Sequence, residues 1–302
     1  MNNKLSKVSI IFLGILFFLN IQSKELIQKE EETIFCFVGD TGEITEAQNT
    51  VASSLASSDC EIIWHTGDII YPSGLESPDD PVFKTKFLIP FKETLNKGKV
   101  FYFTLGNHDY KKEPTSYLEI AKKNEGIHFP NNFYFEKFND LCFVALDTSI
   151  FDKLRMWLKR GEQINWLNQI VDQNLKSCKF SIAVAHHPLF SSGDREYATP
   201  QLSFFLENYV FGVFDLYIVG HNHVLADEGD RQGTRQLISG SGSLPGGSPE
   251  ETIPGIFNVE TPGYLRLTYN PNKKEVFYKF IGSEREEVLW ENSKSGIGFR
   301  AR

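Results

Sequence analysis

Residues 100–109, VFYFTLGNHD, run from an apolar segment directly into a glycine and three polar side chains. Val100 to Leu105 predicts a buried strand, because the segment is short, rich in aromatic and β-branched residues, and bounded by a turn signal. The glycine that follows lets the backbone turn sharply. Asn107, His108 and Asp109 then offer an amide oxygen, an imidazole and a carboxylate. These residue types at a strand end indicate a candidate binding site.

Four other predicted strands also end at polar side chains, three of them after a glycine, and predicted helices separate the strands. The strands and their ends are Thr33 to Val38 before Gly39-Asp40, Glu61 to Thr66 before Gly67-Asp68, Phe180 to Ala185 before His186-His187, and Leu216 to Val219 before Gly220-His221-Asn222-His223. The helices are predicted over Thr45–Ser57, Phe83–Leu95, Glu162–Leu175 and Gln201–Phe211. Strands alternating with helices predict an α/β core. Ligands bind beyond the carboxyl ends of strands in such sheets, so five ends of one sheet would converge on one site.

The donor atoms in these clusters predict a transition-metal site. Carboxylate, amide and imidazole ligands together suit iron, zinc or manganese, whereas calcium prefers oxygen ligands alone. A single Gly-Asp turn is usually only a turn, but five of the seven histidines lie in the ordered clusters. The two outside them are predicted to be a packed strand residue, His65, and a loop residue, His128.

The order of the motifs resembles that of the calcineurin-like metallophosphoesterases, and most of all the small, tartrate-resistant type of purple acid phosphatase. Tyr71, three residues after Asp68, is the residue that favours the purple branch. The tail segments Leu237–Gly242 and Gly263–Arg266 are also similar to the small type. The resemblance extends from about Phe35 to about Tyr269 and covers most of the chain.

This resemblance implies an α/β (α+β) fold, a four-layer αββα sandwich of two mixed sheets with the active site at the C-terminal ends of the strands. It implies an acid phosphatase that hydrolyses phosphate monoesters with a metal-bound hydroxide and forms no covalent phosphoenzyme. The cofactor would be Fe(III) plus a divalent iron, zinc or manganese ion. The implied ligands are Asp40, Tyr71 and His223 for Fe(III), Asn107, His186 and His221 for the divalent ion, and Asp68 between the two.

The same resemblance implies the substrate contacts. Asn107 and His108 would bind phosphate, and His108 would act as the general acid. Arg195 is a further candidate phosphate contact, at a position where this chain departs from the family. Asp109 would either orient His108 or only cap the following turn, and His187 would lie behind the ligands or at the surface. Small purple phosphatases carry a further histidine near position 195. Arginine cannot donate its proton there, but it can hold phosphate with two hydrogen bonds, or pair with a neighbouring carboxylate in solvent.

Composition and charge narrow the class of partner and the location. The chain has 302 residues and a net charge of −8, and this negative charge disfavours nucleic acid as a partner. The expected substrate is a small phosphomonoester, and the protein is expected to be a monomer. Two lysines precede the apolar run Val8–Leu19, which is short for a membrane span of roughly 20 residues. Residues 1–23 are therefore interpreted as a signal peptide, 24–32 as a linker and 33–302 as the catalytic domain. The expected location is secreted or periplasmic, and an uncleaved membrane anchor is the alternative.

Two questions stay open from the sequence. The four cysteines of an exported chain allow three disulfide connectivities, and buried free thiols are equally compatible. The function has two alternatives on the same fold. One is a phosphodiesterase or nucleotidase with two divalent metals, which Tyr71 disfavours. The other is a non-catalytic exported binding protein, which the complete ligand set disfavours.

Overall fold

A computed structural model describes residues 33–151, 153, 156–192, 198–246 and 256–296. The predicted signal peptide and Arg195 lie outside these residues. Within them, no helix combines the length and the apolar character needed to cross a bilayer.

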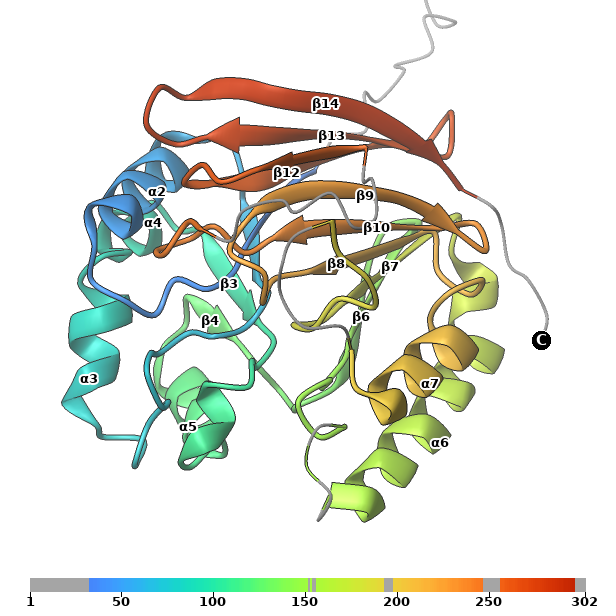
Figure 1. Cartoon of the computed structure of the whole chain (residues 1–302), viewed down its shortest axis with the longest axis horizontal. Coiled ribbons are helices and arrows are strands. Elements are labelled where there is room, and N and C mark those ends of the chain that lie inside the picture. The colour runs from blue at the N-terminus through green and yellow to red at the C-terminus, as the bar shows by residue number, and fades with distance from the viewer. Residues whose placement is uncertain (1–32, 152, 154–155, 193–197, 247–255, 297–302) are drawn as a thin grey trace, which may run out of the picture. The chain divides into compact units, whose positions relative to one another are not determined.

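Two sheets of seven strands form the centre of the fold (Figure 1). The first has the order β14-β13-β12-β1-β2-β3-β4, with bounds β1 Ile34–Val38, β2 Ile62–His65, β3 Val100–Phe103, β4 Ile127–His128, β12 Gly263–Asn270, β13 Glu275–Gly282 and β14 Glu287–Ser295. The second has the order β11-β9-β10-β8-β7-β6-β5, with bounds β5 Tyr134–Phe138, β6 Leu141–Ala145, β7 Phe180–Val184, β8 Leu216–Val219, β9 Leu225–Arg231, β10 Thr234–Ser239 and β11 Phe257–Val259. Both sheets mix parallel and antiparallel pairs.

Helices cover the outer sides of the two sheets (Figure 1). Beside the first sheet lie α2 Glu46–Ser57, α3 Pro81–Phe83, α4 Lys92–Asn96 and α5 Ser116–Lys123, and beside the second lie α6 Trp157–Gln173 and α7 Pro200–Tyr209. The predicted two-sheet α/β sandwich is therefore confirmed. The expectation that all five strand ends belong to one sheet is wrong, because β1, β2 and β3 lie in the first sheet and β7 and β8 in the second.

Local sequence explains the hairpin between β5 and β6 and the break in one predicted helix. β5 and β6 form a hairpin, and Asn139 adopts φ 54° in its turn, a conformation that asparagine tolerates. The single helix predicted over residues 83–95 is broken into α3, a π-helical turn over Lys84–Leu88, and α4. Pro90 lies in the break, and proline cannot donate the backbone hydrogen bond that a continuous helix needs. His128 is part of the short strand β4, so its prediction as a loop residue is wrong.

Aromatic side chains pack the two sheets against each other. Phe143 of β6 contacts Phe35 of β1 and Trp64 of β2, with ring centroids 4.9 and 5.0 Å apart. All three rings are fully buried, and aromatic contacts of this kind add to the free energy of area burial. This packing fixes the position of the strand ends of one sheet relative to those of the other.

Two disulfides occupy equivalent places in the two sheets. Cys36 of β1 is bonded to Cys60, two residues before β2, and Cys142 of β6 is bonded to Cys178, two residues before β7. The Cα atoms are 5.8 and 5.9 Å apart. Each bridge therefore joins a strand to the start of its parallel neighbour, and one of the three possible connectivities is realised.

We expect the second bridge to stabilise the fold. The two cysteines are 36 residues apart, and a bridge closing a loop of this length contributes about 2–4 kcal/mol. The variant Cys142→Ala/Cys178→Ala should lose that much unfolding free energy in a urea titration. The single variant Cys178→Ala should lose nearly the same amount, because either change removes the bridge. Unchanged stability in both variants would contradict this role.

Candidate metal centre and active site

Three of the predicted ligands lie at strand ends in a backbone conformation that is unfavourable for most residues. Asp40, Asp68 and His221 have φ values of 57°, 55° and 69°. Neighbouring glycines leave the space that these turns need. A Cβ atom on Gly106 would lie 2.1 Å from Asp68 Oδ1, and one on Gly220 would lie 2.5 Å from Asp40 Oδ2. The turns are therefore held by close backbone packing at the ends of the strands.

One set of donors gathers around the phenol of Tyr71. Tyr71 Oη donates a hydrogen bond of 2.8 Å to Asp40 Oδ1 and lies 2.9 Å from His223 Nε2. His223 Nε2 is in turn 3.5 Å from Asp40 Oδ1. All three side chains are buried. A phenol, a carboxylate and an imidazole thus meet at one point.

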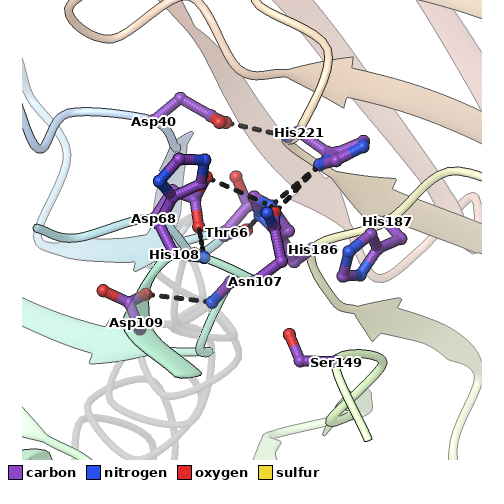
Figure 2. Close-up of polar contacts among 12 residues, drawn as sticks. Asp40, Thr66, Asp68, Asn107, His108, Asp109, Ser149, His186, His187 and His221 are labelled. Carbon is purple, nitrogen blue, oxygen red and sulfur yellow. Dashed lines mark hydrogen bonds and ion pairs between the residues drawn. The ribbon is translucent and has the colours of Figure 1, made fainter. Parts of the chain in front are cut away.

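A second set of donors gathers around the amide oxygen of Asn107. This oxygen lies 3.0 Å from His186 Nε2 and 3.2 Å from His221 Nδ1, and the two ring nitrogens are 3.2 Å apart (Figure 2). Asp68 joins the two sets, since its Oδ2 is 3.5 Å from His186 Nε2. The other ring nitrogen of His186, Nδ1, lies 2.9 Å from the carbonyl oxygen of Thr66, and this contact fixes the orientation of the ring.

These distances fit metal ligation. Atoms that bind one ion at roughly 2.0–2.2 Å lie roughly 3.0–3.5 Å from one another. Among the described residues, two groups of histidine and carboxylate ligands have donor atoms within 4.8 Å of each other: Asp40, Asp68 and His186, and His186, His187 and His221.

The electrostatics of the site also call for cations. Burial and the negative charge of Asp40 raise the pKa of Asp68 to about 8. Burial opposes ionisation of Asp40 as well, but the hydrogen bond with His223 and the charge of His186 outweigh it and lower its pKa to about 2. Burial and the charge of Asp40 raise the pKa of Tyr71. Two buried carboxylates and a phenolate can be anionic together only beside strong positive charge, which metal ions supply.

Asp109 has a structural position that differs from its predicted one. Its fully buried carboxylate accepts hydrogen bonds from the backbone N–H groups of Ile69, Ile70 and Gly106 at 2.9–3.1 Å, and from Tyr117 Oη at 2.6 Å. These bonds tie the Asp68 turn to the turn that follows β3. Neither of the two roles expected for Asp109, orienting the imidazole of His108 or capping the following turn, is seen, because its oxygens bond to these four groups instead.

His108 lies at the open side of the site. Its Nδ1 lies 2.7 Å from the carbonyl oxygen of Pro72, to which it donates, and its Nε2 is 4.0 Å from Asp68 Oδ2. Its side chain is 27% exposed, whereas that of Asp68 is only 2% exposed. Burial, together with the nearby ammonium of Lys111, lowers the pKa of His108, although the hydrogen bond to Pro72 opposes this.

His187 is buried behind the second set of donors. Its Nδ1 lies 2.8 Å from Thr148 Oγ1, and its ring centroid is 4.6 Å from that of His221. Of the two positions that the sequence allowed, the one behind the ligands is therefore found. Arg195 falls outside the described residues, so its contact with phosphate stays a prediction.

The sequence did not reveal the polar role of His65. It is buried in β2 as predicted, and its Nδ1 accepts a hydrogen bond of 3.2 Å from the backbone of Gly67. Its Nε2–H then donates to Thr41 Oγ1 at 2.8 Å. Burial lowers its pKa to about 3, so the ring stays neutral. His65 thereby links the Asp40 turn to the Asp68 turn, and the signal in the sequence was a histidine two residues before Gly67-Asp68.

A family of known proteins matches this fold and site. The model of the calcineurin-like phosphoesterases matches residues 34–225, well over half of the chain. The chain therefore belongs to the calcineurin-like phosphoesterase family, whose members of the purple acid phosphatase type have a dinuclear metal centre.

The similar proteins are mainly acid phosphatases. Purple acid phosphatase 4 of Arabidopsis thaliana is 26% identical over 257 residues, covering 79% of this chain and 73% of that protein. Tartrate-resistant acid phosphatase type 5 of Oryctolagus cuniculus is 25% identical over 270 residues, covering 78% of this chain and 79% of its own. The structure of GAP50, described as the anchor in the inner membrane complex of Plasmodium, has a TM-score of 0.73 at 20% identity, with 90% of both chains covered. The curated relatives identify the chain as a phosphatase.

The close packing at Gly106 predicts a variant that loses metal without unfolding. In Gly106→Ala the new methyl group would overlap the carboxylate of Asp68, so we expect at least one metal ion per chain to be lost in elemental analysis. Gly161→Ala is the control, because a Cβ atom there meets nothing within 4 Å. Circular dichroism should show both variants folded. Full metal content in Gly106→Ala would contradict the proposed position of Asp68.

Proposed function

We propose that the protein is an exported acid phosphatase that hydrolyses phosphate monoesters with an Fe(III)–M(II) centre, where M is iron, zinc or manganese. The observation that carries the proposal is the contact of Tyr71 with both Asp40 and His223. A phenolate and a carboxylate are hard anionic ligands, which suit a trivalent ion. The other set, Asn107, His186 and His221, is neutral and suits a divalent ion. Asp68, between the two sets, is the proposed bridge.

The chain's own residues then have distinct tasks in the reaction. Two bound metal ions would clamp the phosphate and activate water for in-line attack. Asn107 and His108 would hold the phosphate at the open side of the site, and Arg195 is the proposed third contact. The carbonyl of Pro72 holds His108 Nδ1, so Nε2 is the atom that carries a proton to the leaving oxygen. The charge of a bound phosphate would favour the protonated ring and so offset the effect of Lys111.

Two observations support export. Disulfides persist in oxidising compartments, and the described chain has two of them. The charged and apolar pattern of residues 1–23 is typical of a signal peptide, with residues 24–32 as a linker before the catalytic domain. We propose secretion or release to a periplasm, and a monomer acting on a small phosphomonoester.

A non-catalytic role on this fold is the second candidate, because GAP50 shares the fold and is described as an anchor. A binding protein does not require seven convergent metal donors. The arrangement of those donors therefore favours an enzyme. A phosphodiesterase or nucleotidase with two divalent ions would not require the phenol at position 71.

The ligation of Tyr71 predicts a coloured protein. A phenolate bound to Fe(III) absorbs visible light by charge transfer, so the iron-loaded protein should be purple and Tyr71→Phe should be bleached. Tyr102→Phe is the matched control and should keep the colour, since that phenol lies in β3 outside the site. Active, iron-loaded wild-type protein without colour would refute the Fe(III) assignment and favour the two-divalent-metal alternative.

The proton donor role of His108 predicts a dependence on the leaving group. His108→Ala should lose about 10²–10⁴-fold in kcat on alkyl phosphates, whose leaving group needs a proton. It should lose far less on aryl phosphates with acidic leaving groups. A leaving-group series measured on the variant and on wild type tests this. Equal losses across the series would show that His108 binds phosphate and is not the acid.

A further inference from the structure

The ammonium group of Lys111 lies beside the imidazole of His108. Lys111 ends the 3₁₀ turn Asp109–Lys111, and its Nζ lies 3.0 Å from His108 Nδ1 and 3.4 Å from His108 Nε2. The same ammonium lies 3.2 Å from the carbonyl oxygen of Pro72. The side chain is exposed, so its charge faces the solvent at the opening of the site.

The charge of Lys111 is not neutralised by a carboxylate in the part of the chain that the structure describes. Its neighbour Lys112 differs, since it forms an ion pair of 2.9 Å with Glu76. Lys86, another lysine near the site, is paired with Glu43 at 2.9 Å. The Lys111 ammonium, 3.0 Å from His108 Nδ1, therefore lies at the opening of the site without a carboxylate beside it. An anion bound there would supply the opposite charge.

The position of Lys111 relative to His108 tells which part of a substrate it would meet. In the proposed reaction His108 Nε2 delivers a proton to the leaving oxygen, so the leaving group lies beside this ring. Lys111 is 3.4 Å from that nitrogen, and the nitrogen is 4.0 Å from Asp68 Oδ2, the proposed metal bridge. Lys111 therefore lies beside the ring that would meet the leaving group, within reach of both ring nitrogens.

We propose that Lys111 is a specificity-determining residue that binds a second anionic group, carried by the leaving group of the substrate. The favoured substrates would then be those in which a second phosphate follows the scissile bond, as in pyrophosphate and nucleoside diphosphates. This inference rests on the proposed function, because it uses the role of His108 to locate the leaving group.

The reaction balances for pyrophosphate. Water oxygen attacks the terminal phosphorus, and the bond from that phosphorus to the bridging oxygen breaks. The bridging oxygen keeps the electron pair and takes a proton from His108, while the attacking water releases a proton, so two phosphate ions form. Lys111 would donate a charge-assisted hydrogen bond to the departing phosphate, where negative charge increases.

The test compares Lys111→Gln with Lys112→Gln. We expect the ratio of kcat/KM for pyrophosphate to that for phenyl phosphate to fall about tenfold in Lys111→Gln, the size expected for loss of one hydrogen bond between charged groups. Lys112→Gln should keep the wild-type ratio, because its ammonium is paired with Glu76. Lys111→Arg should restore most of the ratio, since the charge returns.

A binding measurement gives the same comparison without turnover. Calorimetric titration should show that Lys111→Gln weakens the binding of methylenediphosphonate about tenfold relative to the binding of methylphosphonate. Lys112→Gln should leave the ratio of the two affinities unchanged. Unchanged preference in Lys111→Gln, or an equal fall in both variants, would overturn the proposal. If wild-type protein loaded with metals hydrolyses neither phenyl phosphate nor pyrophosphate, the proposed function fails, whereas the titration still decides whether Lys111 binds a second anion.

Discussion

The structure depends on keeping two carboxylates buried side by side. Asp40 and Asp68 follow β1 and β2, which are parallel neighbours with Val38 paired to His65, so the two turns must be adjacent. Like charges in a buried place repel strongly unless hydrogen bonds and cations compensate them. Backbone N–H groups compensate one oxygen of each: His221 donates to Asp40 at 2.8 Å and His108 to Asp68 at 2.9 Å. The remaining oxygens face the other donors, where metal ions would complete the compensation.

This constraint explains why the site needs both sheets. Asn107 follows a strand of the first sheet, and it meets His186 and His221, which follow strands of the second. Neither sheet alone supplies a complete donor set. The aromatic packing between β1, β2 and β6 therefore contributes to function as well as to stability, because a small shift between the sheets would separate donors that are about 3 Å apart.

Some features of this site could be predicted from the sequence, and others could not. The positions of the strand ends were predictable because the signal is local: an apolar run followed by a polar side chain, with a glycine between them in four of the five cases. The division of these strands between two sheets was not, since it depends on pairing between residues far apart in the chain. The role of Asp109 was also missed. A carboxylate directly after His108 invites pairing with it, but the short turn directs Asp109 inward, where buried N–H groups of the Asp68 turn require an acceptor.

Charge explains how such a site can select its substrate. The chain carries a net charge of −8, so its overall field repels phosphate esters, and attraction must come from a few local cations. Two other lysines near the site have their charge offset, Lys86 by Glu43 and Lys112 by Glu76. The bound metals would attract the scissile phosphate itself, and every phosphate ester carries that group. Discrimination among esters therefore has to come from charges farther out, on the side where the esters differ. Lys111, next to His108 and exposed to solvent, is in that place, so the residue beside the proposed proton donor is also the one able to distinguish leaving groups.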